Sequence, residues 1–136
     1  MIETLNAMGV DVKDVGAFSE DSVDYPDFAE TVASDVGSGH RDRGILVCGT
    51  GIGMSIAANK IEGVRAALVR NAADARMSRL HNDANVLVLS GDDSDESSVR
   101  EIVRVWWNTE FEGGRHARRV AKIAELERRR RAGESR

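Results

Sequence analysis

The segment that most restricts the fold of this chain is a glycine-rich stretch between a strand-like run and a helix-like run. Residues 44–47 (Gly-Ile-Leu-Val) are continuously apolar, and residues 48–53 (Cys-Gly-Thr-Gly-Ile-Gly) follow them without a break. Residues 54–60 then have the composition of a helix. A buried strand that leads through glycines into a helix is typical of parallel α/β sheets, whose ligands bind beside the carboxyl ends of the strands. The sequence therefore predicts an α/β domain with a site at this loop.

The rest of the chain alternates between the two kinds of element. Strands are predicted where short apolar or alternating runs occur, at residues 10–15, 44–47, 64–69 and 85–89. Helices are predicted where apolar residues recur at helical spacing, at residues 1–8, 24–37, 54–60, 72–81, 97–109 and from about residue 114 onward. Asp24 and Asn71 stand at the expected N-caps of two of these helices. Trp106 and Trp107 lie on an apolar helical stripe, which indicates core or interface positions.

Composition narrows the class of protein. The chain has 136 residues, of which 41% are hydrophobic and 31% are charged, as in ordinary soluble globular domains. Its apolar runs are too short to cross a bilayer, and residues 1–4 lack the features of a signal peptide. A single cysteine, Cys48, excludes an internal disulfide and a zinc site built from several cysteines. We therefore expect one domain over residues 1–136, located in the cytoplasm and not in a membrane.

Positive charge is concentrated at the C-terminal end. Residues 111–136 hold nine basic and four acidic side chains, whereas the whole chain carries a net charge of −4. The basic residues include the run from Arg128 to Arg131, which directly follows a helical stretch. A nucleic-acid-binding tail is one interpretation, but the acidic remainder of the chain would repel a phosphate backbone. The favoured expectation is a solvated helical tail over about residues 124–136, with no nucleic-acid partner.

The glycine loop has the composition of an anion-binding loop. Glycines let backbone N–H groups approach a ligand closely, and the following helix adds unpaired donors at its N-terminus. The spacing does not match G-x-G-x-x-G, and no Lys-Ser/Thr pair follows as in a Walker loop, so both nucleotide-binding motifs are excluded. A tight strand-to-helix turn without a ligand is the alternative.

Cys48 stands at the start of this loop, and its thiol has two interpretations. A nearby helix N-terminus favours the thiolate form, which can accept a proton from a substrate or attack an electrophile. In the second interpretation the side chain is an inert part of the core, as many free cysteines are.

Four segments together resemble a known family, the type B ribose-5-phosphate isomerases and their relatives that act on galactose 6-phosphate and on tetrose phosphates. They are residues 24–29 (DYPDFA), 44–60 (GILVCGTGIGMSIAANK), 78–87 (SRLHNDANVL) and 111–116 (FEGGRH). The resemblance covers about residues 10–123 and implies a Rossmann-like three-layer α/β/α sandwich with a mainly parallel sheet. It implies aldose–ketose isomerisation of a phosphorylated sugar, with ribose 5-phosphate and ribulose 5-phosphate as the favoured pair. No metal or organic cofactor is implied.

The resemblance also assigns roles to residues of this chain. Cys48 matches the proton acceptor at C2 of the sugar, and His81 matches the proton donor that opens the ring. Thr50 adds a hydroxyl donor to a loop that stabilises the developing oxyanion of a cis-enediolate. The residues that match substrate contacts are Gly49, Thr50, Gly51, Ile52, Gly53, Asn82, Arg115 and Arg119, of which the two arginines match phosphate ligands. Because subunits of this family share site residues, we expect a homodimer or homotetramer.

Considered outside the family motifs, the same polar residues have simpler interpretations. A histidine at a helix end is more often a capping or surface residue, and an arginine pair four residues apart is usually a solvated face. His40 matches no family role and is expected to be structural. Tyr25 is expected to approach the site, but no role is assigned to it.

Two departures from the family pattern have consequences. The family begins with a strand that ends in an Asp-His pair, whereas this sequence begins inside the next helix, so one strand and two site residues are missing. We therefore expect four strands instead of five, exposed backbone groups at a sheet edge, weakened turnover and a true start upstream of Met1. Asp92 stands where the family has a substrate-binding arginine, so galactose 6-phosphate or a tetrose phosphate is an alternative substrate.

Two further functions are compatible with these residues. One is a non-catalytic or partner-dependent subunit that binds a sugar phosphate. The second is acyl transfer by a Cys-His pair, for which the sequence shows no third group to orient the histidine.

Overall fold

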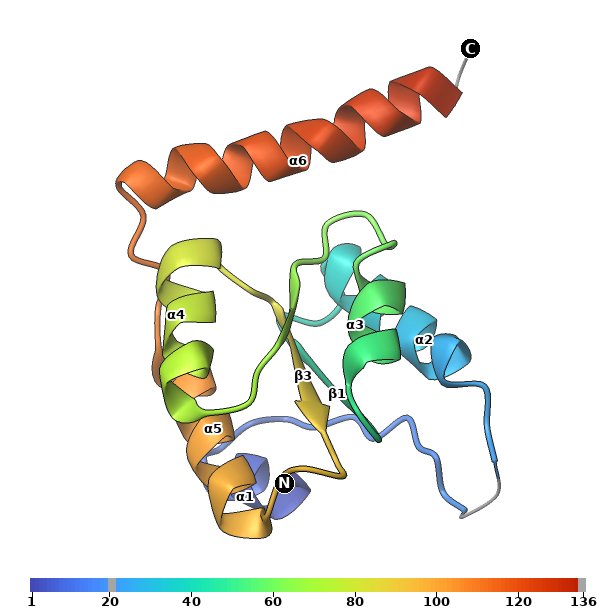
Figure 1. Ribbon diagram of the computed structural model, residues 1–136, viewed down its shortest axis with the longest axis vertical. Coiled ribbons are helices and arrows are strands. Elements are labelled where there is room, and N and C mark those ends of the chain that lie inside the picture. Colours follow the sequence, from blue (N-terminus) through green and yellow to red (C-terminus); the bar gives the residue numbers. More distant parts are fainter. Residues whose placement is uncertain (20–21, 135–136) are drawn as a thin grey trace.

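Three parallel strands form the centre of the molecule (Figure 1). The computed structural model describes residues 1–19 and 22–134. The strands are β1 (Gly44–Cys48), β2 (Ala66–Leu68) and β3 (Val86–Ser90), in the spatial order β1-β3-β2. Cys48 pairs with Ser90 and Leu68 pairs with Val88, so the strands end side by side. We call this end of the sheet the carboxyl edge and the opposite end the amino edge.

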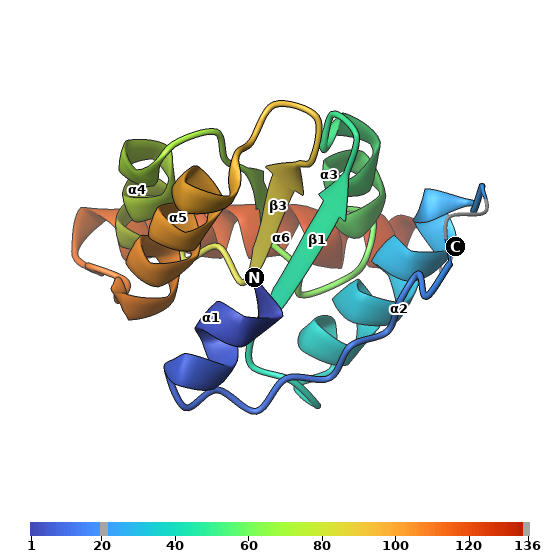
Figure 2. The same cartoon turned by 90° about the horizontal axis from the view of Figure 1, so that it is seen from below.

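Helices cover both faces of the sheet, as Figure 2 shows. α2 (Tyr25–Gly37) and α3 (Ile52–Ala58) pack on one face, and α1 (Ile2–Ala7), α4 (Ala72–Asn82) and α5 (Glu96–Asn108) pack on the other. Each face of the sheet has its own hydrophobic cluster, and the fully buried strand β3 contributes to both. Val86 and Val88 pack in the first cluster, with α2 and α3, and Leu87 and Leu89 pack in the second, with α1, α4 and α5. Trp106 is fully buried in the second cluster. The predicted three-layer α/β/α sandwich with a parallel sheet is confirmed.

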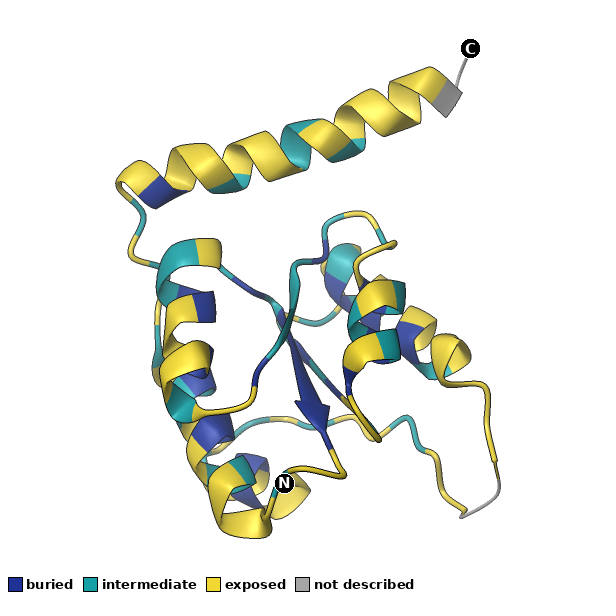
Figure 3. Cartoon of the chain, in the orientation of Figure 1, coloured by how far each residue is buried: buried dark blue, intermediate teal, exposed yellow. Residues whose placement is uncertain are grey.

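The last helix, α6 (Arg115–Glu134), lies across the amino edge and is largely exposed (Figure 3). The carboxylate of Glu127 accepts the N–H of Gly63 at 3.2 Å, and Arg131 pairs with Glu62 at 2.9 Å. Ile123 and Leu126 are exposed on this helix. Residues 135 and 136, the end of the expected basic tail, lie outside the described residues. Among the helices described, none combines the length and apolar character needed to cross a membrane.

The two predicted helix caps differ in outcome. The side chain of Asn71 accepts the N–H of Asp74 at 2.8 Å, which satisfies an N-terminal donor of α4 and confirms that cap. Asp24 occupies the N-cap position of α2, but its side chain makes no capping hydrogen bond there.

The predicted strand at residues 10–15 was wrong, because this segment has no regular secondary structure. Val10 and Val12 do pack against the cluster under α5. Alternating valines report burial on one side of a segment, whereas a strand also requires a neighbouring backbone for its hydrogen bonds. The sheet accordingly has three strands within the described residues, one fewer than predicted.

A cavity of about 520 Å³ lies along the outer edge of β1. We call it the β1-edge groove. It is bordered by β1, α1, α2 and residues 10–17, and its apolar walls include Leu5, Val12, Val15, Phe28, Val32 and Trp107. In the part of the chain that the structure describes, β1 pairs with β3 alone, which agrees with the expected exposed backbone groups at a sheet edge.

Candidate active site

The glycine loop, residues 48–53, folds around the thiol of Cys48 at the carboxyl edge. The N–H of Gly51 donates a hydrogen bond to Sγ of Cys48 at 3.2 Å, and the N–H of Ile52 donates one to Oγ1 of Thr50 at 3.2 Å. The side chain of Cys48 is half-buried, while Thr50 and Ile52 are exposed. The loop therefore presents one thiol and one hydroxyl beside a turn of backbone amides.

Two glycines of this loop are required by close packing. Gly51 has a φ of +79°, and a Cβ there would lie 3.1 Å from the carbonyl oxygen of Leu89. A Cβ on Gly53 would collide with the ring of Tyr25, which therefore lies directly against the loop. The sequence analysis placed Tyr25 near the site without a role, and its contact with Gly53 was not predicted, since no pattern in the sequence connects the two residues.

The turn after β3 closes the other side of the loop. The N–H of Gly91 donates to the carbonyl of Cys48 at 2.8 Å, and the N–H of Asp92 donates to the carbonyl of Gly49 at 3.0 Å. A carboxylate oxygen of Asp92 would lie 2.8 Å from a Cβ on Gly49. The residue that departs from the family pattern thus borders the loop and gives it a negative charge.

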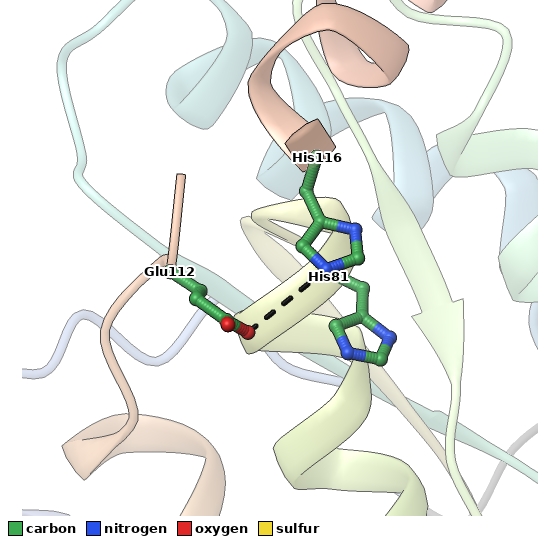
Figure 4. Close-up of side chains that lie close together, drawn as sticks. All are labelled: His81, Glu112 and His116. Carbon is green, nitrogen blue, oxygen red and sulfur yellow. Dashed lines mark ion pairs between the residues drawn. The ribbon is translucent and has the colours of Figure 1, made fainter. Parts of the chain in front are cut away.

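A second group of predicted site residues lies where α4 ends and α6 begins. The rings of His81 and His116 are stacked, with centroids 4.2 Å apart and planes 18° apart. Oε2 of Glu112 lies 3.9 Å from Nε2 of His116, and the dashed line in Figure 4 marks this pair. Burial lowers the pKa of His116, and the nearby His81 and Arg115 lower it further. Asn82 and Arg115 are exposed next to these rings in the sequence, and Arg119 lies one helical turn beyond Arg115.

A buried arginine holds the end of α4 in place. Nε of Arg79 donates to the carbonyl of Thr109 at 3.0 Å, and Nη1 donates to the carbonyl of Ala84 at 2.7 Å and to Asp83 at 2.9 Å. Its side chain is only 6% exposed. Arg79 lies in the family segment at residues 78–87 and the exposed Arg76 does not, but nothing in that segment indicated a buried arginine, so this supporting role was not predicted.

The two groups lie at opposite edges of the sheet. α4 begins beyond the carboxyl end of β2 and finishes before the start of β3, so its 11 residues carry the chain back to the amino edge over about 16 Å (Figure 1). The structure brings Cys48 together with the glycine loop, and it brings His81 together with Asn82 and Arg115. It does not bring Cys48 and His81 together within one chain.

Comparisons with known proteins agree with these features. The family model described as Ribose/Galactose Isomerase matches residues 1–123. Ribose-5-phosphate isomerase B of Escherichia coli is 45% identical over 122 residues, which cover 90% of this chain and 82% of that protein. The structure of ribose-5-phosphate isomerase B from Clostridium thermocellum is 51% identical, with a TM-score of 0.92 over 94% of this chain and 86% of that one.

A third relative has a bound sugar phosphate. The structure of ribose-5-phosphate isomerase B from Mycoplasma genitalium with bound ribulose-5-phosphate is 44% identical and has a TM-score of 0.89. The match covers 93% of this chain and 84% of that chain. Because the family model spans most of the sequence and the relatives share both fold and sequence with it, this chain belongs to the ribose/galactose isomerase family.

Proposed function

We propose that this protein interconverts ribose 5-phosphate and ribulose 5-phosphate through a cis-enediolate. The observation that carries this proposal is the thiol of Cys48, which lies within the glycine loop at the carboxyl edge and accepts a hydrogen bond from Gly51. The names of the E. coli, C. thermocellum and M. genitalium relatives support this reaction and this pair of sugars.

In the proposed reaction Cys48 transfers the proton, and the rest of the loop stabilises the charge that develops on the substrate. The thiolate of Cys48 takes the proton from C2 of the open-chain sugar, and the electron pair of the broken C–H bond forms the C1–C2 double bond. The carbonyl oxygen at C1 then carries the negative charge, which the loop amides and the hydroxyl of Thr50 stabilise. The same thiol returns the proton to C1. The hydroxyl at C2 gives up its proton to the oxygen at C1, so that C2 becomes the ketone and C1 carries the new hydroxyl.

Ring opening and phosphate binding require the residues at the amino edge. His81 donates a proton to the ring oxygen, Asn82 contacts the sugar, and Arg115 and Arg119 bind the phosphate. One helix face presents both arginines, because they are four residues apart. Asp92 supports a substrate orientation in which the phosphate points away from the glycine loop. Its carboxylate lies beside Gly49, where it repels a phosphate and accepts hydrogen bonds from sugar hydroxyls.

The separation of Cys48 and His81 leads us to propose a shared site in a homodimer. A substrate as small as a pentose phosphate cannot reach across the sheet, so the Cys48 loop of one copy must face the His81 group of another. The exposed Ile123 and Leu126 of α6 are apolar surface available for such contact. We also propose that the protein works in the cytoplasm, where reducing conditions keep a catalytic thiol free.

Mixing two inactive variants tests the shared site. Cys48→Ala and His81→Ala are each expected to be inactive alone. In a symmetric dimer, half of the randomly mixed dimers are hybrids and each hybrid has one intact site, so about one quarter of wild-type activity returns. Mixing Cys48→Ala with Cys48→Ser restores none and serves as the control. If the site lies within one chain, the first mixture also stays inactive.

The reaction itself is tested with a panel of sugar phosphates in deuterated water. Turnover is followed by NMR as deuterium enters the ketose at C1. Ribose 5-phosphate should give the highest kcat/KM, whereas a preference for galactose 6-phosphate or a tetrose phosphate would identify Asp92 as a residue that changed the substrate. No exchange with any sugar phosphate, together with retained binding, would favour the non-catalytic subunit.

A further inference from the structure

His81, Glu112 and His116 converge as a set of metal-ligating side chains. Each offers one ligand atom, and these three atoms all lie within 4.8 Å of one another (Figure 4). Two imidazoles and one carboxylate are a ligand set that zinc uses in three-ligand sites, which leave a fourth position open. The separation from Cys48 makes this group distinct from the glycine loop.

The backbone fixes the positions of all three residues. His81 lies in the last turn of α4, and the N–H of Glu112 donates to the carbonyl of Leu80 at 3.1 Å. Gly113 and Gly114 both have positive φ values, 71° and 55°, and turn the chain so that His116 stacks on His81. The convergence therefore follows from a backbone hydrogen bond and a glycine turn, and not from the chance position of long side chains.

The side chains have the freedom that coordination requires. Ligand atoms around a tetrahedral zinc ion are about 3.3 Å apart, so the three groups must move closer together. The Glu112 side chain is 58% exposed and His81 is half-buried, so both can rotate, whereas the buried His116 is a fixed point. In its neutral form the imidazole of His116 offers a nitrogen lone pair to a cation. The charged groups around it are Glu112, which attracts a cation, and Arg115 and Arg119, which oppose it.

We propose that His81, Glu112 and His116 bind a divalent transition-metal ion such as Zn²⁺, and that the bound ion inhibits the enzyme. The ion occupies a ring nitrogen of His81 and blocks the donation of a proton to the sugar ring. The inhibitory consequence rests on the proposed function, whereas the binding site does not. The ion is an inhibitor at this site and takes no part in the reaction.

Cobalt(II) titration of the full chain tests the binding site without any turnover. Wild-type protein is expected to develop the visible absorption of tetrahedral Co²⁺ with one ion per chain, and Zn²⁺ should displace it. His116→Asn and Glu112→Gln should each weaken binding by at least about tenfold. His40→Asn is the matched control, because His40 lies in a separate turn next to Ser38 and should bind as wild type does.

Inhibition is measured separately, with each variant compared with its own activity in a chelator. Zn²⁺ should inhibit wild type and His40→Asn alike, and His116→Asn should resist it. Unchanged cobalt binding by His116→Asn would overturn the proposal and assign the ion to another group, such as the Cys48 thiol. If cobalt binds as expected in a chain that has no isomerase activity, the site stands and the proposed function fails.

Discussion

Sγ of Cys48 lies 3.2 Å from the backbone nitrogen of Gly51, which donates a hydrogen bond to it. This contact ties the proposed proton acceptor to the turn that begins α3. That turn depends on a left-handed conformation at Gly51. The position of the reactive atom is therefore set by backbone geometry, and the predictions for this end of the sheet concern Cys48 and Gly51.

Cys48→Ala should remove turnover and preserve binding. Loss of a positioned general base costs about 100-fold or more in kcat, whereas the proposed phosphate contacts at the other edge are untouched. The measurements are kcat with ribose 5-phosphate and the calorimetric Kd of ribulose 5-phosphate. Ser55→Ala, on the neighbouring helix, is the control. Wild-type kcat in Cys48→Ala would remove the thiol from the mechanism.

Gly51→Ala should destabilise the fold more than a second glycine substitution with the same backbone conformation. Gly39 also has a positive φ, +85°, but no atom lies within 4 Å of a Cβ placed there. Both substitutions should lower the free energy of unfolding by about 1–2 kcal/mol, because alanine is strained in the left-handed conformation. Only Gly51→Ala adds a collision with Leu68 and Leu89. Urea unfolding of the two variants measures the difference. Equal losses would show that the loop relaxes without cost.

Arg79→Met should lower the free energy of unfolding by about 3 kcal/mol, because it leaves the buried carbonyl of Ala84 and the half-buried carbonyl of Thr109 without their side-chain donor. It also removes one of the two guanidinium partners of Asp83, the other being Arg65. Arg76→Met, on the exposed face of the same helix, should change it by less than about 0.5 kcal/mol. Chemical denaturation with both variants gives the comparison. A small loss for Arg79→Met would mean that water replaces the guanidinium.

The sequence predicted local features of the fold well and long-range contacts poorly. The helix start at Asn71 and the loop after β1 depend on neighbouring residues, so capping and glycine patterns were sufficient to locate them. The stacking of His81 on His116 depends on how α4 and α6 meet, and no pattern within either segment contains that information. The strand prediction at residues 10–15 also failed because it concerned a long-range contact. A strand needs a second segment to form backbone hydrogen bonds with it, and the sequence of residues 10–15 alone does not show whether such a partner exists.

Asp95→Asn should lose stability at neutral pH but not in acid. The N–H of Ser98 donates to the Asp95 carboxylate at 2.7 Å and lowers the pKa of that carboxyl. A lowered pKa in the folded state gives stability that is present above the ordinary value of about 3.9 and is lost as the pH falls through the lowered value. The Tm difference from wild type should therefore be a few degrees at pH 7 and vanish in strong acid. Asp24→Asn is the control, since Asp24 makes no side-chain cap, and a similar Tm loss there would contradict the assignment.

Arg115→Ala and Arg119→Ala should each raise KM for the phosphorylated sugar by about tenfold or more, because each removes a proposed charged hydrogen bond to the phosphate. Within the described residues neither guanidinium pairs with a carboxylate, so each is available to an anion. Any activity on free ribose should stay unchanged, since that substrate lacks the phosphate. Arg118→Ala is the control on the same helix. Equal losses on phosphorylated and free sugar would contradict phosphate binding by these residues.

The β1-edge groove has a consequence for how the protein behaves in concentrated solution. The unpaired N–H and C=O groups of a strand edge can form hydrogen bonds with the backbone of another polypeptide. The groove can therefore admit an extended segment with apolar side chains, including one exposed by an unfolding neighbour. Storage lifetime should then depend on protein concentration, because each encounter that adds a strand at β1 also creates a new edge for the next.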